Sequence, residues 1–215
     1  MSIGLNWIIF KNRLTLVVKN LDNKKIFDER IVKKNKNEYK IWMPYKSKLA
    51  AAIYNGLEIF PIKKDSILLY LGSEIESTAS FLSDIVGENG LIYCIQEKDQ
   101  SEIRNMKELA DKRTNVIPLI YEIRHPKEYS SLEAKTVDII YADIKDKNLL
   151  EILLENCKIY LRKKGFLIFV IPTSDLIELD NGNNNLGRKI NDLEIIQIIN
   201  LNSYHKKHSI IIARY

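Results

Sequence analysis

The hydrophobic pattern is most regular between residues 66 and 86. Residues 66–71 form a short apolar run that is long enough for a buried strand, and Gly72 follows it. After a brief polar loop, apolar residues recur at helical spacing, and Ser77 is placed to cap that helix. A strand, a glycine turn and a helix that opens on the turn are typical of the first half of a nucleotide-binding βαβ unit. Backbone N–H groups and the helix dipole favour an anion at such a turn.

The pattern of residues 39–215 predicts a single α/β domain in which strands and helices alternate. One helix begins after Ser47, one spans 149–161, and a charged helix buries Ile103, Met106, Leu109 and Ala110. Strands are expected at residues 66–71, 91–95, 116–120, 137–142, 166–171, 194–201 and 209–213. The last two can pair as an antiparallel hairpin across residues 202–208. This mostly parallel, doubly wound sheet of seven strands with a terminal hairpin is the arrangement of Rossmann-like methyltransferases.

The first 38 residues predict a small antiparallel β domain. Strands are expected at residues 7–10, 14–18 and 25–32, with turn residues at positions 12–13 and 22–23. The polar run KKNKNEYK at residues 33–40 is interpreted as a solvated connector, although its basic residues could instead meet a phosphate backbone. The asparagine-rich segment 180–187 is expected to form a flexible loop.

Composition and charge describe a globular protein with a slight basic excess. Of the 215 residues, 46% are hydrophobic and 28% are charged, which excludes a disordered chain. The net charge of +5 fits either a polyanionic partner or an ordinary basic soluble protein. Cys94 and Cys157 lack metal-ligand spacing and are expected to be buried thiols, so no metal site is predicted. With no signal peptide and no apolar span of membrane length, a soluble cytoplasmic protein is expected.

Several sequence motifs resemble those of a known family. They are YKSKLAAAI, GLEIFPI, LLYLG, STAS, SDIVGENGLIY, KRTNVIP, RHP, YAD and YHKKHSIII, in this order over almost the whole chain. The chain resembles fibrillarin, most closely the archaeal form. The resemblance implies a small β domain followed by an RNA 2′-O-methyltransferase domain that uses S-adenosylmethionine (SAM). It also implies that the protein acts inside C/D-box guide ribonucleoproteins. There a Nop-domain scaffold protein holds the enzyme, and a guide RNA selects the target in rRNA or tRNA by base pairing.

The resemblance carries over most, but not all, of the family's catalytic residues. The family places a lysine, an aspartate, a second lysine and a histidine around the target ribose. Lys48, Asp143 and His208 match the first, second and fourth of these, and together could orient the 2′-hydroxyl and accept its proton. Each also has a structural interpretation, as a helix start, a strand end and a hairpin residue. The second lysine aligns with Pro172, which has neither charge nor donor.

The loop after the first predicted strand departs from the family's cofactor pocket. Gly72, Ser77 and Thr78 remain as cofactor-binding candidates, but Glu74 and Glu76 stand where the family has small residues. A glutamate facing the carboxylate of SAM at ~4 Å would cost up to about 4 kcal/mol at an effective dielectric near 20, unless it turned into water. Bulk at a former glycine position is harder to accommodate. These two glutamates are therefore predicted to obstruct the pocket.

Three further positions of the predicted pocket also differ. Gln96 stands where the family has an acid for the ribose hydroxyls, and Glu122 replaces the aspartate of the adenine contact. Asp146 takes the place of a pocket glutamine, while Asp143 lies at the strand end that borders the cofactor. Departures that converge on one pocket indicate a degenerate SAM site, where binding is weak or absent.

Two functions follow from these observations, with a third kept open. The first is a catalytically degraded fibrillarin paralogue that acts as a structural or regulatory subunit. The second is an active 2′-O-methyltransferase with an atypical pocket, and the third is a methyltransferase fold reused for a cationic ligand. Polar residues of the family motifs suggest a retained surface for the scaffold protein or for an authentic fibrillarin. They are Glu58, Asp84, Glu88, Asn89, Lys112, Arg113 and Asn115.

Overall fold

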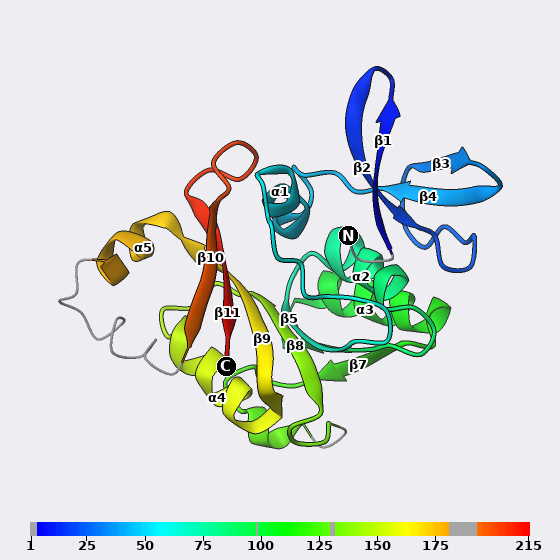
Figure 1. Ribbon diagram of the computed structural model, residues 1–215. Helices are drawn as coiled ribbons and strands as arrows, with labels where there is room; N and C mark the ends of the chain where they lie inside the picture. Colours follow the sequence, from blue (N-terminus) through cyan, green and yellow to red (C-terminus); the bar gives the residue numbers. More distant parts are fainter. Residues whose placement is uncertain (1–3, 98, 130–131, 181–192) are drawn as a thin grey trace.

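The computed structural model describes residues 4–97, 99–129, 132–180 and 193–215. Two sheets organise these residues, a four-stranded antiparallel sheet near the N-terminus and a seven-stranded sheet in the larger domain (Figure 1). The N-terminal sheet has the order β1-β2-β4-β3. Its strands are β1 (Leu5–Phe10), β2 (Arg13–Lys19), β3 (Ile31–Lys34) and β4 (Asn37–Ile41).

The polar run 33–40 is part of this sheet, so its interpretation as a connector is wrong. It forms the hairpin β3–β4, whose turn residues Asn35 and Lys36 both have positive φ angles, as tight hairpins require. The polar composition concealed the strand, because a lysine in a polar run is expected to face water. Lys40, the last residue of the run, is instead fully buried and neutralised by ion pairs. Since β4 pairs with β2 up to Ile41, we propose a domain boundary after residue 41 in place of 38.

The larger sheet confirms the fold expected from the hydrophobic pattern. Its order is β10-β11-β9-β8-β5-β6-β7, parallel from β7 to β9 and antiparallel at β11 and β10. The strands are β5 (Ile67–Gly72), β6 (Leu91–Gln96), β7 (Val116–Ile120), β8 (Val137–Asp143), β9 (Leu161–Pro172), β10 (Glu194–Asn200) and β11 (His208–Arg214). Strands β5, β6 and β7 follow one another toward one edge of the sheet, and β8 and β9 then follow toward the other edge. The strand order therefore reverses between β5 and β8, which is the topological switch point. Ligands of doubly wound sheets bind at the carboxyl ends of the strands at such a point.

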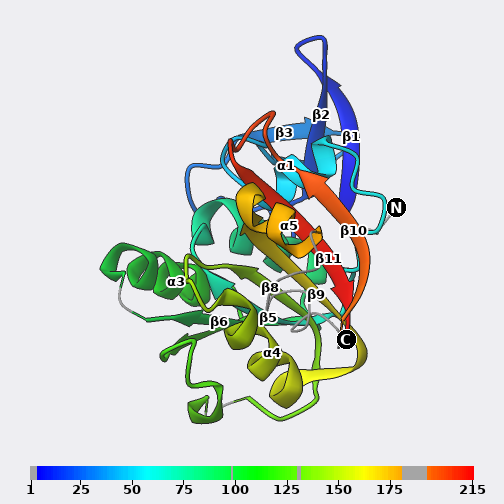
Figure 2. The same ribbon diagram turned by 90° about the vertical axis from the view of Figure 1, so that its left-hand side faces the viewer.

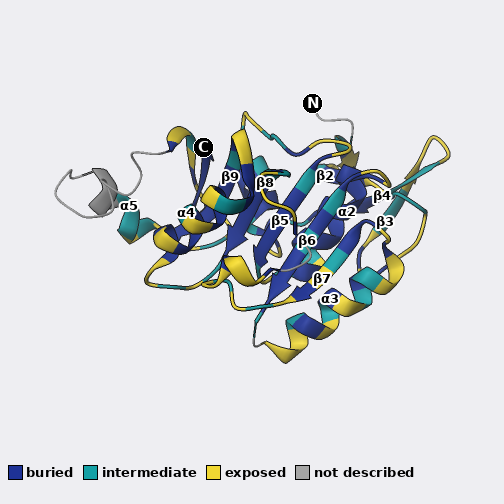
Figure 3. Ribbon diagram, turned by 90° about the horizontal axis from the view of Figure 1, so that it is seen from below, coloured by how far each residue is buried: buried dark blue, intermediate teal, exposed yellow. Residues whose placement is uncertain are grey.

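Helices cover both faces of this sheet (Figures 1 and 2). They are α1 (Lys48–Tyr54), α2 (Ser80–Val86), α3 (Gln100–Lys112), α4 (Leu149–Tyr160) and α5 (Thr173–Asp180), with a π-helical turn η1 (Ile75–Ala79) and a 3-10 turn η2 (Pro126–Glu128). Side chains of α1, α2 and α3 share one core cluster, and those of α4 share another on the opposite face. Alternate residues of β5 enter the two clusters, which explains why the strand is buried on both sides (Figure 3).

Two features of the helices differ from the sequence prediction. Ser77 does not cap α2, because it lies inside η1, and α2 continues from that turn. Helix α5 was not expected, and the predicted loop at residues 180–187 lies outside the described residues except for its first position. Both cysteines are free and buried, as expected. Within the described ranges, no helix is both long and apolar enough to span a membrane.

A buried ion network, the Lys40 cluster, joins the two domains. Lys40 Nζ lies 3.1 Å from Glu29 and 2.8 Å from Asp84, and Arg113 contacts Asp84 at 2.6 Å and Asp22 at 2.5 Å. Lys40, Glu29 and Asp22 belong to the N-terminal domain, whereas Asp84 and Arg113 belong to the larger one. The network therefore fixes one domain on the other.

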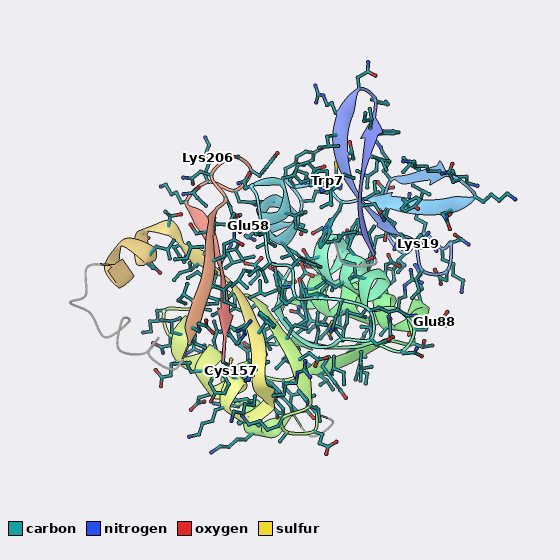
Figure 4. The ribbon with its side chains drawn as sticks, viewed as in Figure 1. Trp7, Lys19, Glu58, Glu88, Cys157 and Lys206 are labelled. Carbon is teal, nitrogen blue, oxygen red and sulfur yellow. The ribbon has the colours of Figure 1, made fainter. Side chains whose placement is uncertain are left out.

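The Lys40 cluster corrects part of the predicted partner surface. Asp84, Arg113 and Asn115 are buried, and Asn115 donates hydrogen bonds to one carbonyl within α2 and to the Gly87 carbonyl just after it. The match of Asp84 and Arg113 to the family motifs therefore reflects the joint between the domains, and that of Asn115 reflects packing inside the larger domain. Glu58 and Glu88 are exposed, and Figure 4 places Glu88 at the edge of the molecule, so both remain candidates for a partner surface.

Candidate functional site

The candidate site lies at the switch point, where β5 and β8 end side by side. Gly72 and Asp143 are register partners at these strand ends. Gly72 has a φ of +124°, and a Cβ atom there would overlap the backbone of Asp143. Glycine is therefore needed both for the backbone angle and for the close approach of the two strands. The turn that follows Gly72 leads into η1.

Three charged side chains meet at this point and are called the Lys48 cluster here. Lys48 is the first residue of α1, which Ser47 caps by accepting a hydrogen bond from the Ala50 N–H. Lys48 Nζ donates to Glu74 Oε1 at 2.6 Å and to Asp143 Oδ2 at 2.7 Å. The three side chains retain 12%, 15% and 6% exposure for Lys48, Glu74 and Asp143, so water has little access to the charges. The structure thus brings Lys48 and Asp143 together, with Glu74 as a third member.

Glu74 reaches this position through an unusual backbone. Its φ of 67° lies in the left-handed region, which glycine adopts without cost and glutamate rarely does. Its carboxylate also accepts from the Lys48 N–H at 3.2 Å and from Thr78 Oγ1 at 3.1 Å. Thr78 is fully buried and shares a second hydrogen bond with Ser47 Oγ at 2.7 Å. Glu74 and Thr78 therefore hold the start of α1 against η1.

Burial governs the electrostatics of the Lys48 cluster. Desolvation, and then the negative charge of Asp143, raise the pKa of Glu74 despite the ammonium of Lys48. Burial alone would lower the pKa of Lys48, but Asp143 and Glu74 outweigh it and raise that pKa. The cluster therefore keeps Lys48 charged and favours the protonated form of Glu74 more than water does.

The backbone donors of the turn are occupied by another carboxylate. The N–H groups of Glu74 and Ile75 donate to the two oxygens of Glu102, each at 3.3 Å. Glu102 comes from the first turn of α3, and its burial raises the pKa of the carboxyl. These are the donors that the sequence predicted for an external anion. Here they are bonded to a side chain of the protein itself.

Of the other predicted cofactor residues, Gln96 reaches the candidate site, and the rest make their contacts elsewhere. Gln96 is buried at the end of β6 and donates to the Gly72 carbonyl. Glu122 is exposed and lies 3.6 Å from His125 Nδ1, while Asp146 pairs with Arg124. Ser77 accepts from the Trp42 indole at 2.7 Å through its carbonyl.

Glu76, predicted to obstruct the pocket, is exposed and lines a groove under the N-terminal sheet. Of the two glutamates, only Glu74 belongs to the Lys48 cluster. Because Glu74 is already paired with Lys48, the two glutamates do not form a joint site for a cation.

A histidine that sequence reasoning missed lies near the Lys48 cluster. His208, the predicted catalytic histidine, is the register partner of Pro172 and donates through Nδ1 to the Lys206 carbonyl at 2.8 Å. His205 donates through Nε2 to the Pro44 carbonyl at 2.8 Å. Burial lowers the pKa of His205, and the charges of Lys48 and Asp143 both act on it. Its position three residues before His208, in the loop that leads into β11, was the available signal.

Comparison with known proteins covers nearly the whole chain. A family model described as Fibrillarin matches residues 4–215. The fibrillarin-like rRNA/tRNA 2′-O-methyltransferase of Pyrobaculum aerophilum is 35% identical over 206 residues, which cover 93% of this chain and 87% of that protein. Fibrillarin of Aeropyrum pernix, crystallised with natively bound SAM, matches with a TM-score of 0.87, 30% identity, and coverage of 99% of this chain and 94% of that one. A chain of a fibrillarin/Nop5p complex matches with a TM-score of 0.82, 30% identity and full coverage of both chains.

Proposed function

This chain belongs to the fibrillarin family, and we propose that it is a structural or regulatory subunit of a C/D-box guide ribonucleoprotein with a degenerate SAM site. The observation that carries this proposal is the position of Glu74. Its carboxylate lies 2.6 Å from the ammonium of Lys48, the residue that resembles the family's first catalytic lysine. A Nop-domain scaffold protein is the expected partner, because a relative of the same fold was crystallised with Nop5p.

The residues at the switch point do not fit SAM as they stand. The amino-acid end of SAM carries a carboxylate, which needs free donors at the turn. In the described part of the chain, the N–H groups of Glu74 and Ile75 are taken by Glu102, and the amide of Gln96 is taken by Gly72. Glu74 adds a negative charge at the same place. Binding would have to break these contacts first, so we expect weak or no affinity.

The absence of the family's second catalytic lysine supports the same conclusion. Pro172 occupies the end of β9, opposite His208, and supplies neither a charge nor a hydrogen-bond donor. The next backbone N–H cannot replace it as a donor, because the Thr173 N–H already donates to the Lys207 carbonyl at 2.9 Å. Loss of one acid–base or electrostatic group typically costs about a hundredfold or more in rate. Any residual methyl transfer should therefore be slow.

An active methyltransferase is the alternative, and one observation favours it. Lys48 and Asp143 remain paired at 2.7 Å, so two members of the catalytic set are in contact. If a partner protein moved Glu74 away, this pair could still orient a ribose hydroxyl. Turnover equal to that of an ordinary fibrillarin, in a complex with scaffold, guide and substrate RNA, would establish this alternative.

Calorimetric titration with SAM tests the proposal. We expect the wild-type chain to bind at least about a hundredfold more weakly than an ordinary fibrillarin, a loss of about 2.7 kcal/mol. Glu74→Gly should recover part of the affinity, because it removes the carboxylate and suits the positive φ angle. Glu76→Gly is the matched control and should recover none, since Glu76 is exposed outside the cluster. A micromolar dissociation constant for the wild type would contradict the proposal.

A further inference from the structure

A second groove opens between the N-terminal sheet and the β10–β11 hairpin. It has a volume of about 570 Å³, and we call it the tyrosine groove. The turn between β1 and β2, the segment before α1 and the hairpin loop contribute to it. Figure 1 shows the hairpin loop beside α1 and the turn between β1 and β2 at the tip of the N-terminal sheet. Residues important for the argument are Lys11, Arg13, Arg30, Tyr45, Tyr54 and Tyr204.

We propose that the tyrosine groove binds a single strand of RNA. The described residues that line it include three cations, Lys11, Arg13 and Arg30, and no acidic residue. Among the described residues, none of these three side chains has an ion-pair partner, although the protein contains many carboxylates. Unpaired cations along a groove are the electrostatic feature that follows a phosphate backbone.

Aromatic rings in the groove supply contacts for the bases, in addition to the cations that contact the phosphates. Tyr45 is 61% exposed and Tyr204 is 37% exposed, so both rings are open to a ligand. Tyr204 is held edge-on by Tyr54, with ring centroids 5.9 Å apart, and the Tyr54 hydroxyl accepts from the Leu16 N–H at 2.8 Å. Tyr54 therefore holds Tyr204 in place, while the rings of Tyr45 and Tyr204 stay accessible to a ligand. Unstacked bases bind such rings regardless of sequence.

The groove also adjoins the candidate site. Tyr45 belongs to the short segment that enters α1 at Lys48. The preceding residue, Pro44, lines the groove and receives the hydrogen bond from His205, whose electrostatic partners include Lys48 and Asp143. A strand in the groove would thus run toward the switch point. This step rests on the proposed function, because it takes the RNA of the guide complex as the ligand.

Single-stranded RNA fits the groove better than a duplex. In a helix the bases are stacked on each other and cannot use Tyr45 or Tyr204, so only the cations would contribute. An acidic peptide would satisfy the cations and leave the rings unused. The combination of open rings with unpaired cations therefore favours a strand whose bases are unpaired.

Fluorescence anisotropy with a labelled oligouridine RNA tests the inference on the full chain. Tyr45→Ala should weaken binding about five- to a hundredfold, the range for one lost base stack, while Tyr45→Phe should retain most of it. Lys11→Ala and Arg13→Ala should each weaken binding and lower the slope of log K against log salt by about one. Lys107→Ala, an exposed cation on α3 that lies outside the groove, is the matched control and should bind as the wild type does.

The outcomes distinguish this inference from the proposed function. Equal losses for Lys107→Ala and Lys11→Ala, or no loss for Tyr45→Ala, would overturn it. Tighter binding of the same sequence as a duplex, or displacement of the RNA by polyglutamate at equal charge, would also overturn it. Tyr45 is exposed, so its variants should fold, and circular dichroism checks this. The assay contains no SAM, so its result is independent of the calorimetric test of Glu74.

Discussion

Two clusters in this protein place one lysine between two carboxylates, and they differ in what surrounds them. Lys40 lies 3.1 Å from Glu29 and 2.8 Å from Asp84, and it is fully buried between the domains. Lys48 lies 2.6 Å from Glu74 and 2.7 Å from Asp143, at the open end of the sheet. In the first cluster a second cation, Arg113, shares the negative charge. In the second, Lys48 is the one cation that the described residues place against both carboxylates.

The difference shows that a lysine paired with two carboxylates can hold the fold together in one place and can give way to a ligand in another. Arg113 contacts both Asp84 and Asp22, so the Lys40 cluster cannot release a member without exposing a buried charge. Each member of the Lys48 cluster keeps some contact with water, and its position is where doubly wound folds bind ligands. We therefore expect the first cluster to control stability and the second to control the candidate site.

The largest effect is expected from breaking the Lys40 cluster with Asp84→Ala. The Asp84 carboxylate holds Lys40, Arg113 and the Leu21 N–H, the last at 3.1 Å. Removing it leaves two cations short of a partner in a buried joint, which typically costs 3–5 kcal/mol, so we expect a loss of about 4 kcal/mol. Urea denaturation at neutral pH measures the free energy of unfolding.

Glu88→Ala is the control for this prediction, because Glu88 is exposed just beyond α2. It should change the free energy of unfolding by less than about 0.5 kcal/mol. If both substitutions cost the same, the Lys40 cluster does not hold the domains together.

The sequence predicted the architecture because the large sheet is buried on both faces. Strand β7 has the predicted bounds, and Ile103, Met106 and Leu109 form the buried side of α3 as the 3.6-residue spacing requires. The hairpin β3–β4 was missed because its residues are mostly polar, and the ion pairs that accommodate the buried Lys40 are distant contacts that a local pattern does not contain. Helix α2 was found, but the π-helical turn before it was read as a cap.

The candidate site was only partly accessible to sequence reasoning. The resemblance of Lys48 and Asp143 to family residues identified two members of the cluster, and the odd residues of the loop identified Glu74. The partner of Glu74 could not be deduced, because Lys48 is far from it in sequence and meets it only through the packing of α1 on η1. For the same reason, Asp84 and Arg113 looked like surface residues although they are buried.

A smaller effect is expected from breaking the Lys48 cluster. Lys48→Met leaves Glu74 and Asp143 facing each other without a cation, and we expect a loss of about 1–3 kcal/mol. The loss should be smaller than for Asp84→Ala, because Glu74 can take up a proton or turn toward water. Combining Lys48→Met with Glu74→Gln should restore part of the stability, which a double-mutant cycle measures as a coupling of about 0.5–3 kcal/mol. Strictly additive losses would show that the two side chains do not interact in solution.

The smallest effect is the dependence of the Glu74 contribution on pH. Burial and Asp143 raise the pKa of Glu74 in the folded protein, so the folded state binds this proton more tightly than the unfolded state does. Lowering the pH from the raised value through the ordinary glutamate value therefore stabilises the wild type relative to Glu74→Gln. Each tenfold difference in proton affinity between the two states is worth about 1.4 kcal/mol.

Urea denaturation at a series of pH values, from about 7 to about 4, measures this difference across the range where glutamate titrates. Glu74→Ala removes the same carboxyl without adding an amide, so its stability relative to the wild type should change with pH in the same way. A difference between wild type and variants that stays constant over the range would mean that the carboxyl titrates alike in both states. In that case Asp143 and burial would not act on Glu74 in solution, and the contrast between the two clusters would lose its electrostatic basis.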